Sequence, residues 1–358
     1  MDNKHIITFI ILVVIILSAS ACPKSTSNDV NHDSSFDRKD IGMNIIDSEN
    51  NIKNIPVFNK RKVFTLEDIL EEKIKNAIVM GALGEIKPIE EYGCFESNES
   101  SIDYINKDGQ IIVKEAIGVI VNPPMNSIMN SYYDMLSFLE EGEDVLFILL
   151  DGFGYHQYQY AFENGFLPFL GKQPKINKAL SVYKPVTNAG LAAIITGKSP
   201  AENGVHSRKQ RELETDSIFK VVEDLDKKAL YIEGNIGILK TEIEPVLNLD
   251  NNGDGFTDDE VYKSTMEAMG KDYNLVFTHF HGIDDSGHTY GDLSLETMEF
   301  IKRVDAYVEE IASKWKGKII ITADHGMHST EYGGDHGEFR YEDMVVPYII
   351  MDGGNQFE

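Results

Sequence analysis

The stretch KIIITADHGMHSTEYGGDHGE, residues 318–338, decides how this chain is predicted to fold. The apolar run at residues 318–321 is followed at once by a loop that holds three histidines and two aspartates. A loop with surface histidines is the simpler explanation, but six of the ten histidines in the chain lie between His279 and His336. Imidazole and carboxylate side chains are typical zinc ligands, so the pattern predicts a strand that ends at a metal site.

The residues around this stretch alternate between short apolar runs and helical patterns. Strands are predicted at residues 145–150, 179–183, 229–233, 274–279, 318–322 and 346–351, and helices at residues 218–225, 258–269 and 295–315. Short apolar strands separated by helices indicate an α/β fold with a doubly wound, mainly parallel sheet and helices on both faces. Ligands bind such sheets at the carboxyl ends of the strands, so polar residues at those ends are the candidate site.

The N-terminus resembles a lipoprotein export signal. Residues 1–21 contain an apolar run at residues 6–17, which is short for a membrane span and typical of a signal peptide. The sequence ASAC at residues 19–22 is similar to the bacterial lipoprotein box, which implies cleavage before Cys22 and lipid on its sulfur. An uncleaved anchor and plain secretion are the alternatives. We therefore expect an extracytoplasmic protein that its lipid holds at the cell membrane, with a flexible tether at residues 22–56.

The rest of the chain divides into two parts. Residues 57–142 are predicted to form a small accessory region, with a helix at residues 65–77 and a hairpin turn at residues 106–109. Residues 143–358 carry the alternating pattern and the polar clusters, and are predicted to form the domain that holds the site.

The composition restricts the classes of partner. The chain has 33 basic and 59 acidic residues, and its net charge of -26 disfavours nucleic-acid polymers and anionic membrane surfaces. A small anionic substrate would need local positive charge, and bound divalent cations are the natural source. The chain has two cysteines, Cys22 and Cys94, so lipidation of Cys22 would leave no disulfide within the chain.

Four polar clusters follow predicted strands, and each also has an ordinary structural explanation. Asp151 ends the run at residues 145–150, where an Asp-Gly pair is commonly only a turn. Thr187 starts a helical stretch rich in Ala and Ile, either as an N-cap or as a nucleophile whose developing charge meets a helix N-terminus. The other two clusters are a glycine-containing loop with Asp284 and His288, and the quoted stretch with Asp324, His325 and His336.

The order of these motifs resembles that of the alkaline phosphatase superfamily, and is most similar to its type I phosphodiesterase/nucleotide pyrophosphatase branch. The resemblance runs from Asp-Gly at residues 151–152 through D-x-x-G-H at 284–288 and T-A-D-H-G-M at 322–327 to G-x-H-G at 334–337. It implies an alkaline phosphatase-like fold. It also implies one metal ion held by Asp151, Thr187, Asp324 and His325, a second held by Asp284, His288 and His336, and supporting or structural roles for His279, His281, Asp285 and His328.

The resemblance implies a two-metal hydrolase of phosphate esters that works through a threonyl-phosphate intermediate on Thr187. Mixed histidine and aspartate ligands favour zinc, with manganese as the alternative. The substrate would be a small phosphorylated molecule, and monoesters, diesters, pyrophosphates and phosphonates are all compatible. Asn188, adjacent to Thr187 where the nucleotide pyrophosphatases usually carry an asparagine further along the helix, is the candidate phosphate contact.

A protein of another class is the alternative, namely a non-catalytic, metal-dependent surface binding lipoprotein with the same fold. Such a protein would have no need of Thr187 together with the six other candidate ligands. The enzyme is therefore favoured, and the sequence leaves its oligomeric state open.

A separate acidic motif, DNNGDGFTDDE at residues 250–260, is similar to the first half of a calcium loop. Its candidate ligands are Asp250, Asn252, Asp254 and Asp258. The twelfth position of the loop is Val261 instead of the usual glutamate, and the alternative is an acidic turn that caps the helix predicted at 258. The sequence predicts Ca²⁺ here, in addition to the two divalent ions of the main site.

Overall fold

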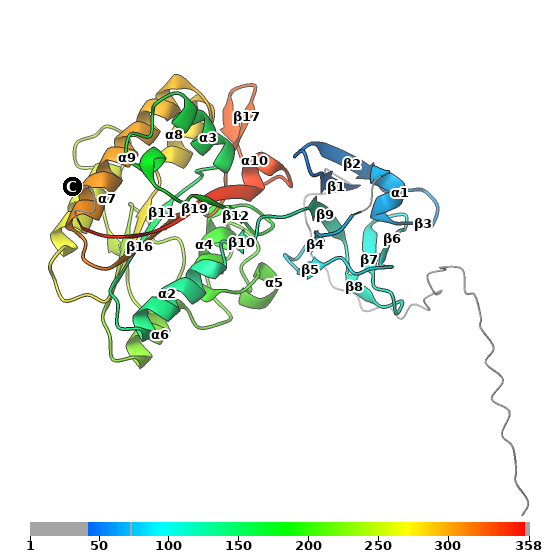
Figure 1. The fold of residues 1–358 in the computed structure, drawn as a ribbon, viewed down its shortest axis with the longest axis horizontal. Helices are drawn as coiled ribbons and strands as arrows, with labels where there is room; N and C mark the ends of the chain where they lie inside the picture. The colour runs from blue at the N-terminus through cyan, green and yellow to red at the C-terminus, as the bar shows by residue number, and fades with distance from the viewer. Residues whose placement is uncertain (1–41, 72–73, 355–358) are drawn as a thin grey trace, which may run out of the picture.

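The structure is a computed structural model that describes residues 42–71 and 74–354. The predicted signal peptide, Cys22 and the first part of the predicted tether lie outside the described residues. Within the described ranges, no helix is both long enough and apolar enough to cross a membrane. Figure 1 shows an N-terminal β region, coloured blue to cyan, beside an α/β domain coloured green to red.

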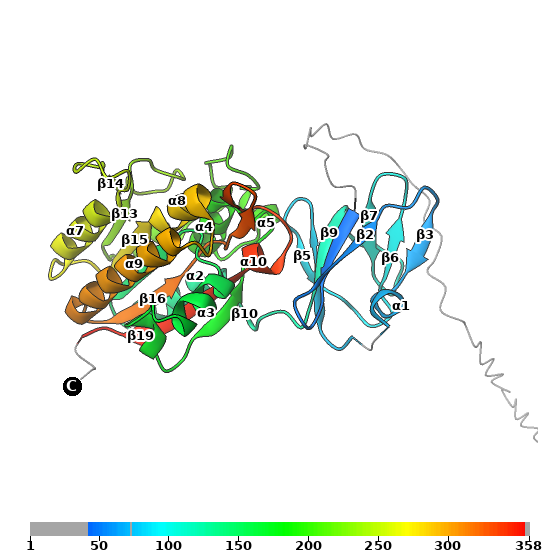
Figure 2. The same ribbon diagram turned by 90° about the horizontal axis from the view of Figure 1, so that it is seen from above.

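The N-terminal β region, residues 42–121, consists of two sheets packed face to face (Figure 2). The first has the order β2 (Ile52–Pro56), β1 (Gly42–Ile46), β9 (Ala116–Val121), β4 (Ala77–Gly81) and β5 (Ile86–Pro88). The second is antiparallel, with the order β3 (Lys62–Phe64), β6 (Cys94–Ser97), β7 (Ile102–Ile105) and β8 (Ile111–Val113). Apolar side chains from both sheets, among them Ile45, Val79, Phe95 and Tyr104, are buried between them. Alternation of apolar and polar residues along the strands explains this arrangement.

Residues 42–56 are not a flexible tether, so this part of the prediction is wrong. They form the hairpin of β1 and β2, because Met43 and Ile45 alternate with more exposed neighbours and enter the core. The Asp47 carboxylate accepts hydrogen bonds of 2.9 Å from the backbone N–H groups of Glu49 and Asn51, which fixes the turn between the strands.

The predicted helix at residues 65–77 is shorter, since α1 spans Leu66–Leu70. Thr65 and Asp68 form a capping box at its start, and Glu71 ends it in the left-handed conformation with φ of 58°. The predicted turn at residues 106–109 is present between β7 and β8. Cys94 is buried at the start of β6.

The α/β domain is built on an eight-stranded sheet. Its order is β10 (Asn126–Ser127), β12 (Asn177–Leu180), β19 (Val345–Asp352), β16 (Lys318–Thr322), β11 (Val145–Leu150), β15 (Leu275–Phe280), β13 (Ala229–Glu233) and β14 (Val246–Leu247). Every neighbouring pair is parallel except those that include β19. The six residues of β11 are all buried, as expected for a central strand that is apolar on both faces.

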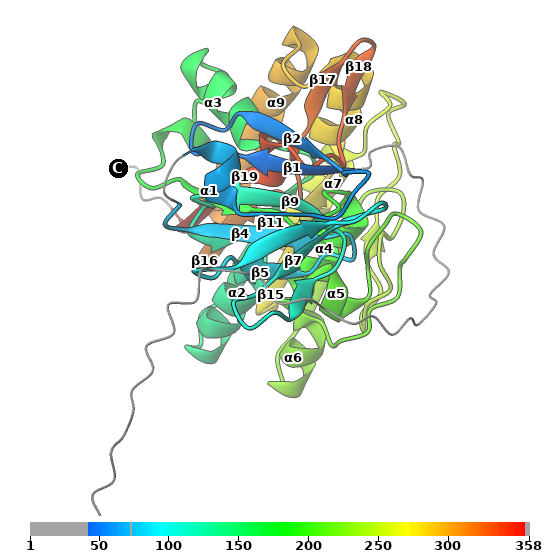
Figure 3. The same cartoon turned by 90° about the vertical axis from the view of Figure 1, so that its right-hand side faces the viewer.

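Helices cover both faces of this sheet, which confirms the predicted fold class (Figure 3). One face carries α2 (Asn130–Glu140), α4 (Thr187–Thr196) and α6 (Ile218–Asp224); the other carries α3 (Tyr155–Glu163), α7 (Asp258–Ala268), α8 (Gly282–Tyr290) and α9 (Leu295–Lys314). The short elements are α5 (Pro200–Asn203), α10 (Tyr341–Met344) and the hairpin of β17 (His328–Thr330) and β18 (Gly333–Asp335). Although the prediction assigned residues 126–140 to the accessory region, β10 and α2 pack with this domain.

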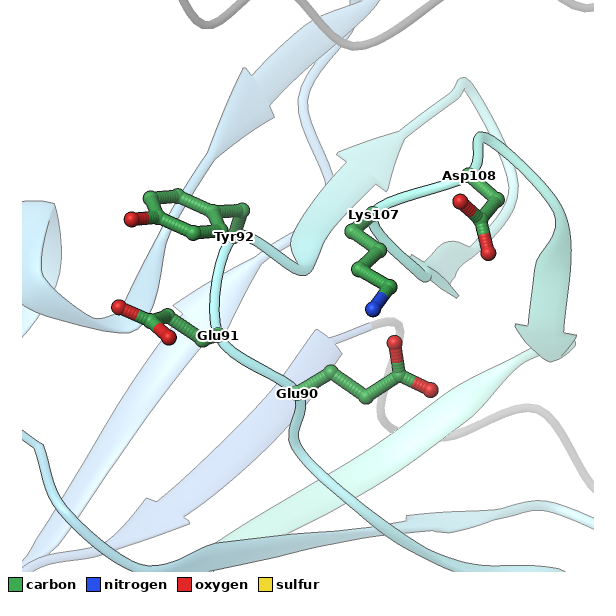
Figure 4. A pocket seen from close by; sticks show the side chains of 5 residues that line it. All are labelled: Glu90, Glu91, Tyr92, Lys107 and Asp108. Carbon is green, nitrogen blue, oxygen red and sulfur yellow. The ribbon is translucent and has the colours of Figure 1, made fainter.

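The two parts of the chain share an apolar interface. Ile46, Met80 and Ile120 of the β region are buried with Leu180, Phe339 and Met344 of the α/β domain. The amide of Asn44 donates a hydrogen bond of 3.2 Å to the backbone carbonyl of Phe339. In the β region, a surface pocket is lined by Glu90, Glu91, Tyr92, Lys107 and Asp108 (Figure 4).

Candidate metal centre

The candidate site lies where four parallel strands end. Asp151 follows β11, and its backbone N–H donates a hydrogen bond of 2.9 Å to the carbonyl of Phe280 at the end of β15. Asp324 and His325 follow β16, and Thr187 begins α4 after the chain leaves β12. Because these strands run in the same direction, their carboxyl ends bring residues far apart in the sequence to one edge of the sheet.

Thr187 is the first residue of α4 and is 8% exposed. Its hydroxyl oxygen lies 3.5 Å from Asp151 Oδ1 and 3.4 Å from His325 Nε2. The first backbone N–H groups of an α-helix have no partner within the helix, so α4 presents its positive end where Thr187 begins it. This geometry suits a hydroxyl that takes up an anionic group.

Glycine allows α4 to approach the loop after β16. A Cβ atom on Gly190 would stand 2.7 Å from both the Cβ and the carbonyl oxygen of Asp324. The Ser181 hydroxyl donates a hydrogen bond of 2.5 Å to the same carbonyl. These contacts hold Asp324 against the turn of helix that carries Thr187.

Three histidines share one hydrogen-bond pattern. The Nδ1 atoms of His288, His325 and His336 contact the backbone carbonyls of Gly334, Gly326 and Pro185 at 3.0, 2.9 and 2.8 Å. A carbonyl can only accept, so each Nδ1 carries a proton, and in the neutral ring Nε2 presents a lone pair. In each ring a backbone carbonyl thus selects the tautomer that a metal ligand requires.

The Nε2 atoms face carboxylates. His325 Nε2 lies 3.4 Å from oxygens of Asp151 and Asp324, and Asp284 lies 3.3 Å from His288 Nε2 and 3.6 Å from His336 Nε2. Asp324 Oδ2, Asp284 Oδ1 and His288 Nε2 are buried atoms without a hydrogen-bond partner. Lone pairs that face one another without a donor are unfavourable, and a cation among them would satisfy all of them.

Asp284 and His288 lie on a helix, and the predicted loop at this position is wrong. They stand four residues apart on α8, so both side chains lie on one face. Gly282 and Gly287 serve close packing here: a Cβ on the first would collide with the ring of Phe300, and a Cβ on the second with the sulfur of Met327. The glycines that suggested a loop are therefore explained by close packing around α8.

Burial and neighbouring charge set the protonation of the ligand candidates. Burial lowers the pKa of His325 to about 4 and that of His336 to about 3, so both rings are neutral at pH 7. The carboxylate of Asp284, whose Oδ2 lies 3.3 Å from Nε2, raises the pKa of His288 to about 9. Burial, together with the charges of Asp151 and Asp284, raises the pKa of Asp324 well above its usual value. Bound divalent cations would reverse this preference for protons.

Sequence reasoning missed Glu233, a fully buried carboxylate at the end of β13. His281 bridges it to the site, with Nε2 2.7 Å from Glu233 Oε2 and Nδ1 3.0 Å from Asp151 Oδ2. His279 Nδ1 lies 3.0 Å from Glu233 Oε1. Despite burial, these two carboxylates hold the pKa of His281 well above its usual value. The only signal available in the sequence was the position of Glu233 at a strand end.

Sequence reasoning also missed Arg208, on a largely exposed segment before α6. Its guanidinium is in hydrogen-bond contact with Nε2 of His336, where the predicted second metal ion would bind. A cationic group therefore already occupies the position next to this lone pair. No pattern in the sequence marks this arginine.

Asn188 differs from expectation. The side-chain nitrogen of Asn188 donates to the carbonyls of Gln210 and Ile238 at 2.9 and 3.4 Å, so the donor expected to contact phosphate already has backbone partners. The Asn188 side chain, one residue after the start of α4, thus contacts the segments that carry Gln210 and Ile238. His328 Nδ1 lies 2.7 Å from Asp343 Oδ1, a contact with a residue outside the candidate ligand sets.

The described residues fit divalent metal ions. Three groups bring ligand atoms within 4.8 Å of one another: Asp151, Asp324 and His325; Asp284, His325 and His336; and Asp151, His279 and His281. The first two overlap the predicted sets, with His325 common to both. In the third, both ring nitrogens of His281 already contact carboxylates, so this group reads as an ion-pair network beside the site.

Known proteins match parts of this chain. Residues 244–356 match the model of the Metalloenzyme superfamily, which supports the prediction of a metalloenzyme for that part of the chain. GPI ethanolamine phosphate transferase 1 is similar: the Neurospora crassa protein is 32% identical over 108 residues, or 28% of this chain and 10% of that protein. The mouse protein is 33% identical over 103 residues, or 26% and 11%. The chain thus spans about a tenth of the length of these relatives.

Among solved structures, phosphonoacetate hydrolase from Sinorhizobium meliloti matches with a TM-score of 0.42 and 18% identity, covering 52% of this chain and 57% of that one. The C-terminal periplasmic domain of EptC from Escherichia coli, in complex with zinc, matches with a TM-score of 0.43 and 12% identity, covering 59% and 73%.

Proposed function

We propose that this protein is a divalent-metal-dependent enzyme that cleaves phosphate esters through a covalent phosphate ester on Thr187. The observation that carries the proposal is the shared arrangement of His288, His325 and His336, each with Nδ1 on a backbone carbonyl and Nε2 toward buried carboxylates. Without a cation this arrangement is energetically unfavourable, whereas with a bound cation the Nε2 atoms and the carboxylates can act as its ligands. The match to the Metalloenzyme superfamily supports a phosphoryl-transfer enzyme as the general class.

The residues would act as follows. Asp151, Asp324 and His325 would hold one ion beside Thr187, and Asp284, His288 and His336 a second. When bound, the ions would lower the pKa of the Thr187 hydroxyl and stabilise negative charge on the phosphate. Thr187 Oγ1 would form the bond to phosphorus as the leaving oxygen departs, and the start of α4 would stabilise the resulting threonyl ester.

Arg208 is the candidate for a direct phosphate contact. It is a cationic side chain in contact with the ligand candidate His336, and the guanidinium presents paired N–H donors that match phosphate oxygens. Asn188, whose amide is engaged with backbone carbonyls, would instead position the loop that carries Arg208.

The fate of the threonyl ester separates two outcomes. Attack by water makes the protein a hydrolase, which we favour as the simpler reaction. Attack by another hydroxyl makes it a transferase, and the similarity to GPI ethanolamine phosphate transferase 1 favours this second candidate. Both outcomes use the same nucleophile and the same ligands.

Product analysis distinguishes them. Purified protein with zinc would be given p-nitrophenyl phosphate, bis-p-nitrophenyl phosphate and p-nitrophenyl thymidine monophosphate, with and without glycerol as an acceptor. Free phosphate products alone indicate hydrolysis, and a glycerol adduct indicates transfer. Acid quenching followed by peptide mass spectrometry should find the covalent group on Thr187, and Thr187→Ala should lose it. Zinc binding without turnover of any substrate would instead support the non-catalytic binding protein.

We also propose that the protein acts outside the cytoplasm, attached by lipid on Cys22. The apolar run at residues 6–17 and the ASAC motif support this proposal. A small phosphate ester would be a suitable substrate at such a location, since it could reach the enzyme from solution or from the membrane surface.

A further inference from the structure

The acidic motif at residues 250–260 forms a loop that leads into α7. Asp250 Oδ1 accepts a hydrogen bond of 2.7 Å from Gly253 N–H, and Oδ2 accepts one of 2.9 Å from Gly255 N–H. Asn252 and Asp254 each accept from the N–H two residues ahead, at 2.8 and 3.0 Å. The chain thus curls around the side chains at its first, third and fifth positions.

Two further carboxylates close this loop. Glu260 is 6% exposed, and its Oε1 accepts a hydrogen bond of 3.2 Å from Asn251 N–H, so the side chain points back into the loop. Asp259 Oδ2 lies 3.4 Å from the amide nitrogen of Asn252. The remaining oxygens, Glu260 Oε2 and Asp259 Oδ1, are buried and have no hydrogen-bond partner. A buried carboxylate oxygen without a donor is costly unless a cation meets it.

The charges around the loop leave an excess of negative charge. Lys263 contacts Asp259 at 2.5 Å and lies 3.9 Å from Glu260, and Arg303 lies 3.7 Å from Asp254. These two cations face four carboxylates, those of Asp250, Asp254, Asp259 and Glu260. Every candidate ligand is an oxygen atom, which suits a hard cation such as calcium and not zinc.

Asp258 is not available as a ligand, contrary to the sequence-based prediction. It is 1% exposed, and its carboxylate accepts hydrogen bonds from the N–H groups of His281 and Gly282 at 3.0 and 3.1 Å. Asp258 is the first residue of α7 and so joins the end of the acidic loop to the start of α8, which carries Asp284 and His288.

We infer that residues 250–260 bind one calcium ion through the side chains of Asp250, Asn252, Asp254, Asp259 and Glu260. This ion stabilises the start of α7 and, with it, the hydrogen bonds that Asp258 accepts from the N–H groups of His281 and Gly282. Asp259 and Glu260 supply the carboxylate that a standard loop carries at its twelfth position, where this chain has Val261. The inference is independent of which phosphate ester the main site cleaves.

The test is calcium-dependent stability of the full chain. The protein is stripped of metal, and melting curves and calcium titration calorimetry are recorded for the wild type, Asp254→Asn, Glu260→Gln and Asp272→Asn. The first two substitutions keep an oxygen that can accept the existing backbone hydrogen bonds but remove a charge. The control Asp272 is exposed and pairs with Lys228 elsewhere on the surface.

We expect one calcium ion per chain and a rise in melting temperature of about 5 °C at a free calcium concentration roughly a hundred times the dissociation constant. Asp254→Asn and Glu260→Gln should each lose most of this rise, and Asp272→Asn should keep it. Asp284→Ala, which removes a ligand of the main site, should also keep it, which separates the two sites. An unchanged wild-type melting curve, a rise that survives in both loop variants, or a rise lost in Asp284→Ala would overturn the inference.

Discussion

The hydroxyl oxygen of Thr187 lies 3.4 Å from Nε2 of His325, across a contact that joins the first turn of α4 to the loop after β16. The imidazole is neutral, because burial lowers its pKa to about 4, and its proton is held on Nδ1 by the carbonyl of Gly326. The ring is therefore a ligand or an acceptor toward Thr187 and not a proton donor.

Replacement of Thr187 tests its assigned role. Thr187→Ala removes the attacking oxygen and leaves six candidate protein ligands, so turnover of an aryl phosphate ester should fall by about a thousandfold or more while most of the zinc remains. Thr187→Ser keeps a hydroxyl and should keep part of the rate. Zinc content and turnover are measured for each variant. Near wild-type turnover by Thr187→Ala with zinc bound would exclude the covalent route.

Zinc binding should release protons at pH 7. In the metal-free protein the pKa of His288 is raised to about 9, so His288 binds a proton that a metal must displace, and the raised pKa of Asp324 acts in the same direction. His325 and His336 are already neutral and contribute none. Each released proton should strengthen apparent zinc binding by about tenfold per pH unit as the pH rises.

Calorimetry in buffers of different ionisation enthalpy measures the number of protons released. His288→Ala should lower that number by about one relative to the wild type. Equal binding heats in all buffers would show that these groups are not protonated before the metal binds.

Glu233→Gln should weaken the site without a direct loss of a ligand. Glu233 orients His281, which in turn contacts Asp151, and such supporting contacts are commonly worth about 10- to 100-fold in metal affinity or activity. Zinc affinity is measured by competition with a chelator. The control is Glu223→Gln on α6, whose side chain is 72% exposed and should leave affinity unchanged. Equal affinities for both variants would argue against a positioning role.

Arg208→Ala should raise KM for phosphate ester substrates while zinc content stays near that of the wild type. The expected loss in kcat/KM is about tenfold to a hundredfold, because a charge-assisted hydrogen bond to phosphate is worth roughly 1.5 to 3 kcal/mol. Arg208→Lys should recover part of it, since the charge remains. Lys209→Ala, at the adjacent exposed position, is the matched control. A change confined to zinc content would assign Arg208 to the ligand set and not to the substrate.

The lipid anchor on Cys22 can be tested directly. Lipidation requires the sulfur of Cys22, which directly follows the small residues Ala19, Ser20 and Ala21. Mass spectrometry of the mature protein from its native cell should find a diacylglyceryl group on Cys22. Discovery of an intact Met1 would contradict the lipid anchor.

Most strands of the α/β domain were predictable because they are short, continuous apolar runs with polar residues at their ends. The prediction for β11 and β16 matches the structure residue for residue, and three helices differ by at most one residue at an end. The β19 strand was also found, but its antiparallel direction was not, because strand direction depends on pairing and not on local composition.

The parts of the site that were not predictable depend on contacts between distant segments. Glu233 and Arg208 carry no recognisable motif, and only the fold brings them to His281 and His336. The ligand candidates, by contrast, lie at strand ends with characteristic spacing. Asp258 fits the spacing of a calcium loop, yet its carboxylate reaches a different helix.

The contact between Gly118 and Phe339 has a consequence for how the protein can be divided. A Cβ on Gly118 would collide with the ring of Phe339, so that ring rests directly on the backbone of β9, three residues beyond His336 in the chain. Removing the β region would uncover Phe339, Met344 and Val345, all buried side chains. The α/β domain therefore depends on the β region to cover these apolar side chains, and a shortened chain that begins near residue 124 should be prone to aggregation and should hold His336 less firmly.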